Sequence, residues 1–219
     1  MSRFLFLAFM LALLTLSAPG CSNDPAGPIE GSALELSLTA EESPFPVQAD
    51  LWSSYPTCEG ARLQPCDPRG TNSSWLVSLD DRLRNRIESS ARYDYSVKPF
   101  PARFIYQTEI LVLHSEDDAM LAYRNLSRPS APLYDPKIFS SGEVIKASSR
   151  IGDESQVAGK KLSDPACRGA SECDSYPVTL TARYANVVFV VKTSGSAKQE
   201  QLEQVALLIL TKIRRSEKP

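Results

Sequence analysis

The chain has 219 residues, with 24 Lys and Arg against 26 Asp and Glu, and a formal net charge of -2 at pH 7. Acidic and basic residues are intermixed, so the sequence lacks the basic stripe of a nucleic-acid-binding protein, and no nucleic-acid partner is predicted. Residues 33–219 are enough for one domain with its own core, and nothing within them has the composition of a linker.

The N-terminal segment has the organisation of a bacterial secretory signal. One positive charge in residues 1–3 precedes an apolar run over residues 4–16. This run is shorter than the about 20 residues that cross a bilayer, and it leads through small residues to Cys21. We therefore predict a signal peptide over residues 1–20. An ordinary cleaved signal with a coincidental cysteine and an uncleaved signal anchor remain as alternatives.

The tetrapeptide Ala18-Pro19-Gly20-Cys21 resembles the lipobox of bacterial lipoproteins, although Ala18 stands where leucine is usual and Pro19 also departs from the pattern. The resemblance implies that Cys21 is lipidated, becomes the mature N-terminus and anchors the protein to a cell membrane on its extracytoplasmic side. Residues 21–32 contain several turn formers and are expected to form a flexible tether. Residues 33–219 are then a single extracytoplasmic domain.

Lipid on Cys21 leaves an even set of cysteines in a compartment that permits disulfides. These cysteines are Cys58, Cys66, Cys167 and Cys173. Seven residues separate the first two and five separate the second two, which suits two short-loop bridges, although the sequence allows three connectivities. Structural zinc sites usually have cysteines two to four residues apart, often with histidines, and this chain has one histidine, His114. No metal and no cofactor are predicted.

The first half of the domain is predicted to begin with a short strand over residues 33–38 and a helical turn opened by the capping-box pattern of residues 39–42. A second helix is predicted to open at residue 78. Its core face carries Leu79, Leu83 and Ile87.

The longest strand is predicted over residues 103–113, where apolar residues on both sides indicate a central position in a sheet. Ser115 then caps a helix that Pro129 ends. The inward-facing residues of this helix are Ala119, Ala122, Tyr123 and Leu126.

The second half is predicted to contain a strand over residues 143–149 and a turn at Gly152-Asp153-Glu154-Ser155. Residues 178–184 and 187–191 flank Ala185-Asn186 and predict an antiparallel hairpin, in which Asn186 can take a positive φ. The last helix is predicted to open at Ser196. Its core stripe is Leu202, Val205, Ala206, Ile209 and Ile213, widened by Leu208 and Leu210.

This order of elements favours an α+β fold, with a mainly antiparallel sheet covered on one face by packed helices. Two irregular loops, residues 55–72 and 163–175, contain the two cysteine pairs. Each loop is expected to be closed by its own disulfide.

The Gly152–Ser155 turn and the strand pair around Arg183-Tyr184-Ala185-Asn186 resemble the PknH-like extracellular sensor domain, a family of actinobacterial envelope lipoproteins and of the outer part of a membrane-spanning kinase. The resemblance extends loosely over residues 34–214 and departs at Ala185, where glycine is expected. It implies an antiparallel sheet with packed helices, two disulfides and a cleft for a ligand. It provides no catalytic residues.

The residues themselves offer few candidates for catalysis. His114 directly follows a predicted strand, but no Gly-x-Ser-x-Gly elbow accompanies it. Acidic pairs fall in first helical turns, where acids stabilise the helix dipole. These pairs are Glu41-Glu42, Asp80-Asp81 and Asp117-Asp118, whereas Asp153-Glu154 lies in a predicted loop.

We therefore expect a lipid-anchored, non-enzymatic module that binds either a small apolar or glycan-like molecule in a cleft or another envelope protein. The sequence does not specify the ligand-binding residues. The alternative is a cell-surface hydrolase, which would place His114 or Asp153 in a cleft beside a nucleophile.

Overall fold

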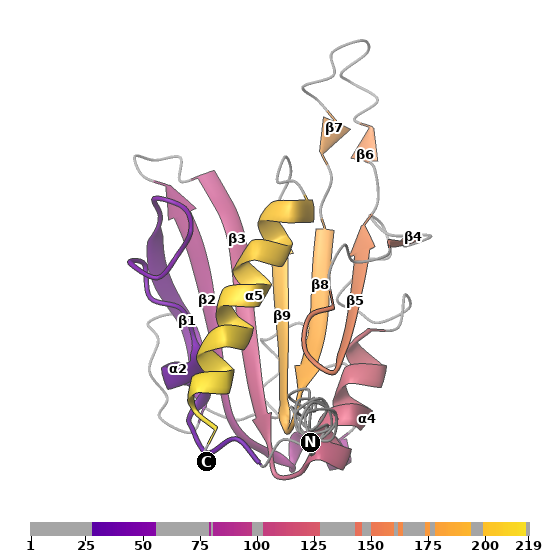
Figure 1. Ribbon diagram of the computed structural model, residues 1–219. Helices are drawn as coiled ribbons and strands as arrows, with labels where there is room; N and C mark the ends of the chain where they lie inside the picture. The colour runs from indigo at the N-terminus through magenta and orange to yellow at the C-terminus, as the bar shows by residue number, and fades with distance from the viewer. Residues whose placement is uncertain are drawn as a thin grey trace, which may run out of the picture.

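The computed structural model describes residues 28–55, 79, 81–97, 103–127, 143–145, 150–159, 162–163, 174–175, 178–193 and 199–217. Its main feature is a seven-stranded sheet in the order β1-β2-β3-β9-β8-β5-β4, in which every neighbouring pair is antiparallel (Figure 1). The predicted α+β class with a mainly antiparallel sheet is therefore confirmed. In chain order the strands of this sheet are β1 (Gln48–Tyr55), β2 (Ile87–Val97), β3 (Arg103–Leu113), β4 (Glu143–Ile145), β5 (Glu154–Gly159), β8 (Val178–Tyr184) and β9 (Val187–Thr193). The short strands β6 (Leu162–Ser163) and β7 (Asp174–Ser175) pair separately. The helices are α2 (Ala33–Leu36), α3 (Asp81–Arg84), α4 (Glu116–Leu126) and α5 (Gln199–Arg215).

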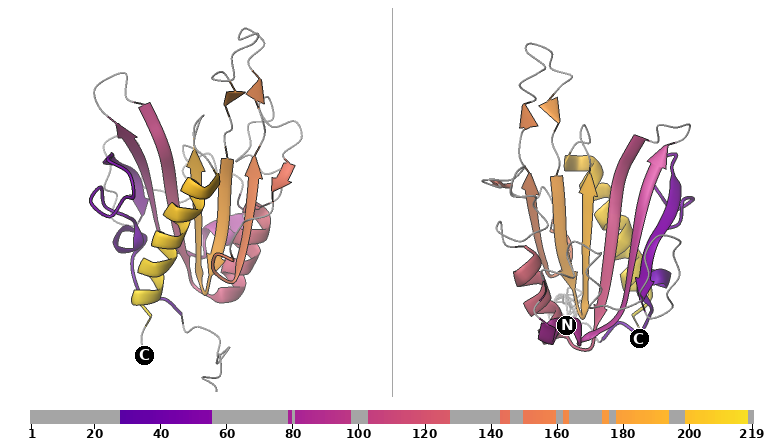
Figure 2. Two further views of the ribbon diagram at one scale, coloured as in Figure 1. Left: turned by 45° about the horizontal axis from the view of Figure 1, so that its top comes forward. Right: turned by 180° about the vertical axis from the view of Figure 1, so that it is seen from behind.

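Helices lie on both faces of the sheet, whereas the sequence favoured cover on one face (Figure 2). Helices α2 and α5 pack on the face that carries Tyr106 and Phe189. Helices α3 and α4 pack on the other face, which carries Leu113 and Val188. The central strands β3 and β9 present apolar side chains in both directions, so each face needs a covering layer.

Strands β1, β2 and β5 were not predicted, and the helix expected from residue 78 is much shorter. Leu79, Leu83 and Ile87 are buried as predicted, but α3 ends at Arg84 and Ile87 opens β2 instead. Strand β2 pairs along its length with both β1 and β3. This pairing with distant parts of the chain overrides the short helical pattern around Leu83.

The N-terminal part of the domain also differs from the prediction. The predicted strand over residues 33–38 is the helical turn α2, which a capping box opens: the Ser32 N–H donates to Glu35 Oε2 over 2.9 Å and the Glu35 N–H donates to Ser32 Oγ over 3.3 Å. Ile29 is 2% exposed and its N–H donates to Asn186 Oδ1 over 2.7 Å. The domain therefore begins by Ile29, inside the segment expected to be a tether.

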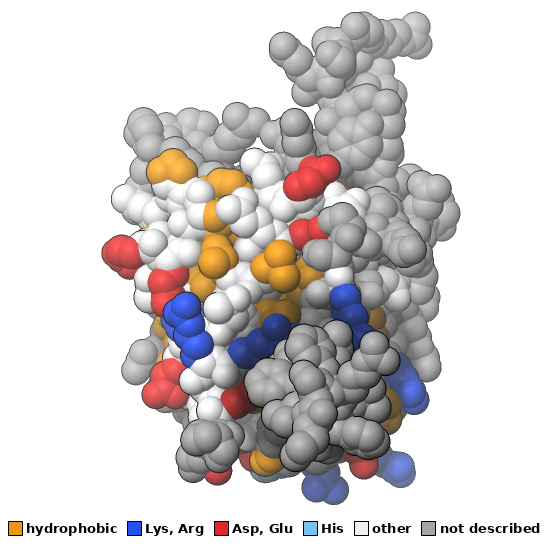
Figure 3. Space-filling view, viewed as in Figure 1, with side chains coloured by type: hydrophobic (Ala, Val, Ile, Leu, Met, Phe, Trp, Pro, Cys, Tyr) orange, Lys and Arg blue, Asp and Glu red, His pale blue; other side chains and the backbone are white. Residues whose placement is uncertain are grey.

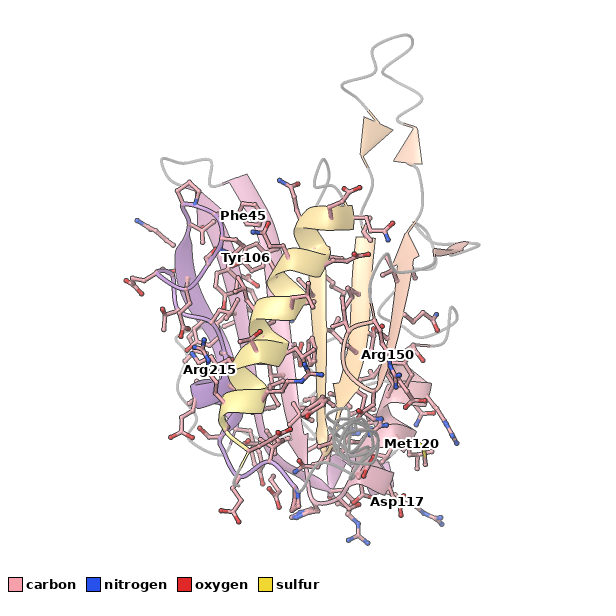
Figure 4. The ribbon with its side chains drawn as sticks, in the orientation of Figure 1. Phe45, Tyr106, Asp117, Met120, Arg150 and Arg215 are labelled. Atoms are coloured by element: carbon pink, nitrogen blue, oxygen red, sulfur yellow. The ribbon has the colours of Figure 1, made fainter. Side chains whose placement is uncertain are left out.

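Aromatic residues join the first part of the chain to the sheet. The Tyr95 and Tyr106 rings stack with centroids 4.2 Å apart, and Phe45 packs edge-on against Tyr106 (Figure 4). The Tyr95 hydroxyl donates to the Leu38 carbonyl, and the Tyr106 hydroxyl donates to Ser43 Oγ, each over 2.7 Å. These contacts hold the segment after α2 against the sheet face that α5 covers.

The strongest local patterns predicted their elements well. Strand β3 has the predicted bounds, Ser115 caps α4, and the hairpin of β8 and β9 turns at residues 185 and 186. The positive φ of this turn, 49°, belongs to Ala185 and not to Asn186 as expected. The buried residues of α5 include all five of the predicted stripe.

Several predictions lie outside the described residues. They concern residues 1–27, most of the loops 55–72 and 163–175, residues 146–149, and all five cysteines, so lipidation and both disulfides stay predictions. Within the described ranges, no helix has the length and apolar character needed to cross a membrane.

Candidate functional site

Polar side chains form two adjacent rows on the sheet face against which α4 packs. Side chains of a strand alternate between faces, so the pairing register decides which residues of neighbouring strands stand side by side. We name the polar residues of these two rows the polar sheet face. The first row contains Arg92 on β2, Glu109 on β3 and Thr181 on β8; the second contains Asp94 on β2, Gln107 on β3, Lys192 on β9 and Thr179 on β8.

Helix α4 covers a neighbouring part of the same face. Its buried residues pack in one cluster with Leu111, Val188 and Val190, of which Val190 lies between Glu109 and Thr181 in the first row. Above the middle of β2 and β3, Figure 2 shows no helix of the described part of the chain. The face thus changes from apolar beneath α4 to polar beside it.

Glu109 lies at the centre of the polar sheet face and is 2% exposed. Burial raises the pKa of its carboxyl to about 8, against the opposing influence of Arg92 and Lys192. Its Oε2 atom has no hydrogen-bond partner among the described residues. At neutral pH the carboxyl is therefore mainly protonated, and it can act as a donor as well as an acceptor.

Arg92 stands directly opposite Glu109 on β2. Its guanidinium lies 4.9 Å from the centroid of the Trp52 ring, and its Nε is 4.0 Å from Asp94 Oδ1, beyond hydrogen-bond reach. That Asp94 oxygen accepts a hydrogen bond from Gln107 Nε2. The buried Arg92 Nε is left with no hydrogen-bond acceptor in the described part of the protein.

Lys192 and Thr181 complete the rows on the other side of Glu109. Lys192 on β9 pairs with Gln107 on β3, which lies two residues before Glu109 on the same face of the sheet. Burial lowers the pKa of its amino group, and the Glu109 carboxyl opposes this effect. Within the described ranges, Thr181 Oγ1 is also buried without a hydrogen-bond partner. Donor groups therefore approach Glu109 directly from Arg92 on β2 and diagonally from Lys192 on β9, whereas Val190 stands directly opposite it on β9.

Arg183 occupies the same face beside α4 and has a different role. It is 8% exposed at its side chain; its Nη1 donates to Glu116 Oε1 over 2.9 Å, and its Nε donates to Glu154 Oε2 over 2.8 Å. The Asp153 Oδ2 atom is 3.3 Å from Arg183 Nη1. These contacts join α4, the Gly152–Ser155 turn and the hairpin, so the motifs that carried the family resemblance pack together as a structural unit.

Among the residues that the structure describes, no catalytic arrangement is found around His114. Its side chain is 49% exposed and its Nδ1 lies 3.0 Å from Glu88 Oε1, with no hydroxyl of the described residues bonded to it. Asp153 is committed to Arg183 and to the Ala185 N–H. Within the described ranges, neither residue lies beside a nucleophile, and the hydrolase alternative itself stays untested.

The described acidic pairs have structural partners. Asp118 accepts the Ser115 hydroxyl over 2.7 Å, while its own N–H donates to Ser115 Oγ over 3.1 Å at the start of α4. Glu42 Oε2 accepts the Thr39 N–H over 2.8 Å and Lys212 Nζ over 2.6 Å. No group of three or more metal-ligating side chains occurs among the residues that the structure describes.

The opposite face contains a shallow depression of about 430 Å³, lined by residues that include Leu34, Tyr93 and Lys212. Its main cation already has partners, since Lys212 Nζ donates to the Ser37 carbonyl over 2.7 Å and to Glu42. The surface over α5 shows apolar side chains among single charged ones (Figure 3). This depression is a weaker candidate than the polar sheet face, where Glu109 Oε2, Arg92 Nε and Thr181 Oγ1 are buried without a hydrogen-bond partner among the described residues.

Gln107 and Glu109 were not predicted as site residues, although the sequence contained one signal for them. Both fall on the same side of the predicted central strand as Leu111 and Leu113. A carboxyl at a central, two-sided position is unusual and marks a candidate site. Their partners on β2 had no such signal because β2 was not recognised as a strand.

Comparisons with known proteins give a resemblance of fold. No protein-family model and no curated protein matches the sequence. Among solved structures, the crystal structure of the extracellular domain of PknH from Mycobacterium tuberculosis is similar, with 12% identity and a TM-score of 0.46. The similarity covers 87% of this chain and 98% of that one. It is a weak likeness at the level of fold, in agreement with the predicted resemblance, and it carries no argument about function.

Proposed function

We propose that the protein is a non-enzymatic extracytoplasmic binding module, anchored in a membrane by lipid on Cys21, and that it holds a polar ligand on the polar sheet face. The observation that carries this proposal is Glu109, whose carboxyl is 2% exposed and whose Oε2 has no hydrogen-bond partner among the described residues. A ligand that pairs with Glu109 and with Arg92 Nε would satisfy both groups.

Buried polar atoms without a hydrogen-bond partner are rare in native proteins. A buried polar atom without a partner costs about 1–3 kcal/mol, and most buried polar groups in native proteins are hydrogen-bonded. On this face Glu109 Oε2, Arg92 Nε and Thr181 Oγ1 all lack partners within the described ranges. Local disagreement with packing rules is expected where a site awaits its ligand.

The arrangement favours binding over hydrolysis. A general base must be ionised, whereas the pKa of Glu109, raised to about 8 by burial, keeps it largely protonated at neutral pH. Asp94, the second carboxylate of the face, accepts from Gln107.

A protein partner is less well supported than a small ligand. The exposed large apolar residues of the described ranges are Leu121 on α4 and Leu207 on α5. These helices cover opposite faces of the sheet, so the two leucines do not form one patch. Isolated exposed leucines are ordinary on protein surfaces.

The anchor is tested by intact mass spectrometry of protein extracted from membranes, before and after reduction and alkylation, beside a Cys21→Ala variant. We expect a mature chain that begins at Cys21 with added acyl mass, and four cysteines that alkylate only after reduction. An unlipidated chain with free thiols would contradict both the anchor and the disulfides.

The binding site is tested by thermal unfolding of the detergent-purified protein against a panel of small oxyanions, neutral sugars and amines. We expect at least one class to raise the melting temperature of the wild type and not that of Arg92→Gln. Arg86→Gln, at an exposed arginine just before β2, is the matched control and should respond like the wild type. A panel without effect on the wild type would reject the proposed function.

A further inference from the structure

Basic side chains from both neighbouring strands flank Glu109, while the apolar Val190 stands directly opposite it on β9. Arg92 faces it directly from β2, and Lys192 lies diagonally to it on β9, next to Gln107. Directly opposed residues in an antiparallel pair have Cβ atoms about 4.5–5.5 Å apart, and diagonal neighbours are within reach of long side chains. Two basic side chains thus flank one buried carboxyl.

The acceptors on this face are already engaged or neutral. Asp94 Oδ1 accepts from Gln107 Nε2 and lies 4.0 Å from Arg92 Nε. Glu109 has a pKa raised to about 8 by burial, so at neutral pH it offers Arg92 little negative charge. The other groups level with Glu109, namely Ser53, Thr181 and Gln156, are uncharged. Among the described residues, Arg92 Nε therefore has no acceptor within hydrogen-bond distance, and an added anion could supply one.

The guanidinium of Arg92 is also held in place before a ligand arrives. Its central carbon lies over the Trp52 ring, 4.9 Å from the ring centroid, and this cation–π contact favours a fixed position of the guanidinium. The Arg92 and Asp94 side chains are 15% and 24% exposed, in contrast to the buried Glu109. Access to the carboxyl is therefore from the side of the partly exposed Arg92 and Asp94.

We propose that the ligand of the polar sheet face is an oxyanion, a carboxylate or phosphate group, which hydrogen-bonds to Arg92 Nε and to the carboxyl of Glu109, with Lys192 close by on β9. This inference rests on the proposed function and specifies the ligand class. A protonated carboxyl donates its O–H to one ligand oxygen, and the basic groups neutralise the ligand charge. No bond other than hydrogen bonds is formed.

The arrangement couples binding to a proton. An anion beside Glu109 disfavours its ionised form, so the pKa of Glu109 rises further when the ligand binds. Below pH about 8 the proton is already present and binding takes up none. Above that pH each binding event must take up one proton, so affinity falls as the pH increases. Burial also lowers the pKa of Lys192, so loss of its proton would weaken anion binding in the same direction.

The test follows the emission of Trp52, which lies beneath Arg92, in a Trp75→Phe background of the detergent-purified full-length protein. Acetate and inorganic phosphate are titrated at pH 7 and pH 9, and the two probes separate carboxylate from phosphate preference. We expect saturable binding of at least one anion, about tenfold weaker at pH 9 than at pH 7. Arg92→Gln should weaken it at least tenfold, and Arg86→Gln should leave it unchanged.

Glu109→Gln supplies the decisive comparison, because glutamine keeps the shape and a donor but does not titrate over this range. We expect this variant to bind the anion at pH 7, and its affinities at pH 7 and pH 9 should differ much less than those of the wild type. Titration of Lys192 would account for any difference that remains. Equal pH dependence in Glu109→Gln and the wild type would overturn the coupling, as would the absence of anion binding.

The failure of this inference can be told apart from failure of the proposed function. Methylammonium and glucose are titrated in the same assay. If either binds in an Arg92- or Glu109-dependent way and the anions do not, the face is a binding site but not for oxyanions. If no probe binds and the wild type also gives no thermal shift, the site itself is wrong.

Discussion

Asp153 Oδ2 accepts a hydrogen bond of 2.9 Å from the backbone N–H of Ala185, so that the turn before β5 is tied to the turn between β8 and β9. A second bond runs in the opposite sense, from the Asp153 N–H to the Arg183 carbonyl, also over 2.9 Å. Ala185 has a φ of 49°, a left-handed conformation that alanine seldom adopts. The aspartate helps to hold it there.

Asp153→Ala should therefore lower the free energy of unfolding by about 2 kcal/mol, the cost of removing a charged acceptor from partly buried donors. Asp117→Ala is the matched control on the exposed first turn of α4, visible in Figure 4, and should cost about 0.5 kcal/mol through the helix dipole. Urea unfolding followed by circular dichroism measures both. Equal losses would show that the link between the turns has no structural weight.

Gly152→Ala should be more damaging. Gly152 has a φ of 72°, and a Cβ there would lie 2.3 Å from the Arg183 carbonyl oxygen, so the backbone must move. We expect a loss of about 3 kcal/mol, similar to other strained backbone substitutions. Gly31→Ala, whose Cβ would meet no atom closer than 3.7 Å, is the control and should change stability little. The comparison uses the same urea unfolding assay.

Asn186→Ala should loosen the N-terminal segment. The Asn186 side chain is 3% exposed, accepts the Ile29 N–H over 2.7 Å and donates to the Leu113 carbonyl over 2.9 Å. Loss of both bonds leaves buried backbone groups unpaired and should cost about 3 kcal/mol. Limited proteolysis should then cut near Ile29 sooner than in the wild type. Asn125→Ala, on the less buried side of α4, should give the wild-type pattern.

Glu109 gives stability a pH dependence with a defined sign. Its pKa is raised from 4.5 to about 8 by burial, so the folded state holds a proton that the unfolded state releases. The contribution of Glu109 to the free energy of unfolding is greatest below pH 4.5. It falls as the pH rises toward about 8, by at most about 1.4 kcal/mol per pH unit. Unfolding measured between pH 5 and 9 should show this fall in the wild type and in Glu88→Gln. In Glu109→Gln it should be absent, and a persistent fall would place the titration on another group.

The sequence predicted those elements whose signals are local. The alternation of β3, the Ser115 cap of α4, the hairpin of β8 and β9 and the core stripe of α5 each appear within a few adjacent residues. By contrast, Ile29 is held in the core by a hydrogen bond to Asn186, which is distant in the sequence. No local sequence pattern predicts this burial.

The polar sheet face shows the limit most clearly. By itself the sequence determined that β3 is a central strand and that Glu109 lies within it, because side chains alternate along any strand. Only the tertiary structure decided that Arg92 and Lys192 flank that carboxyl, because the register between β2, β3 and β9 sets these neighbours. Register depends on the packing of both faces of the whole sheet, so the site exists only in the folded protein.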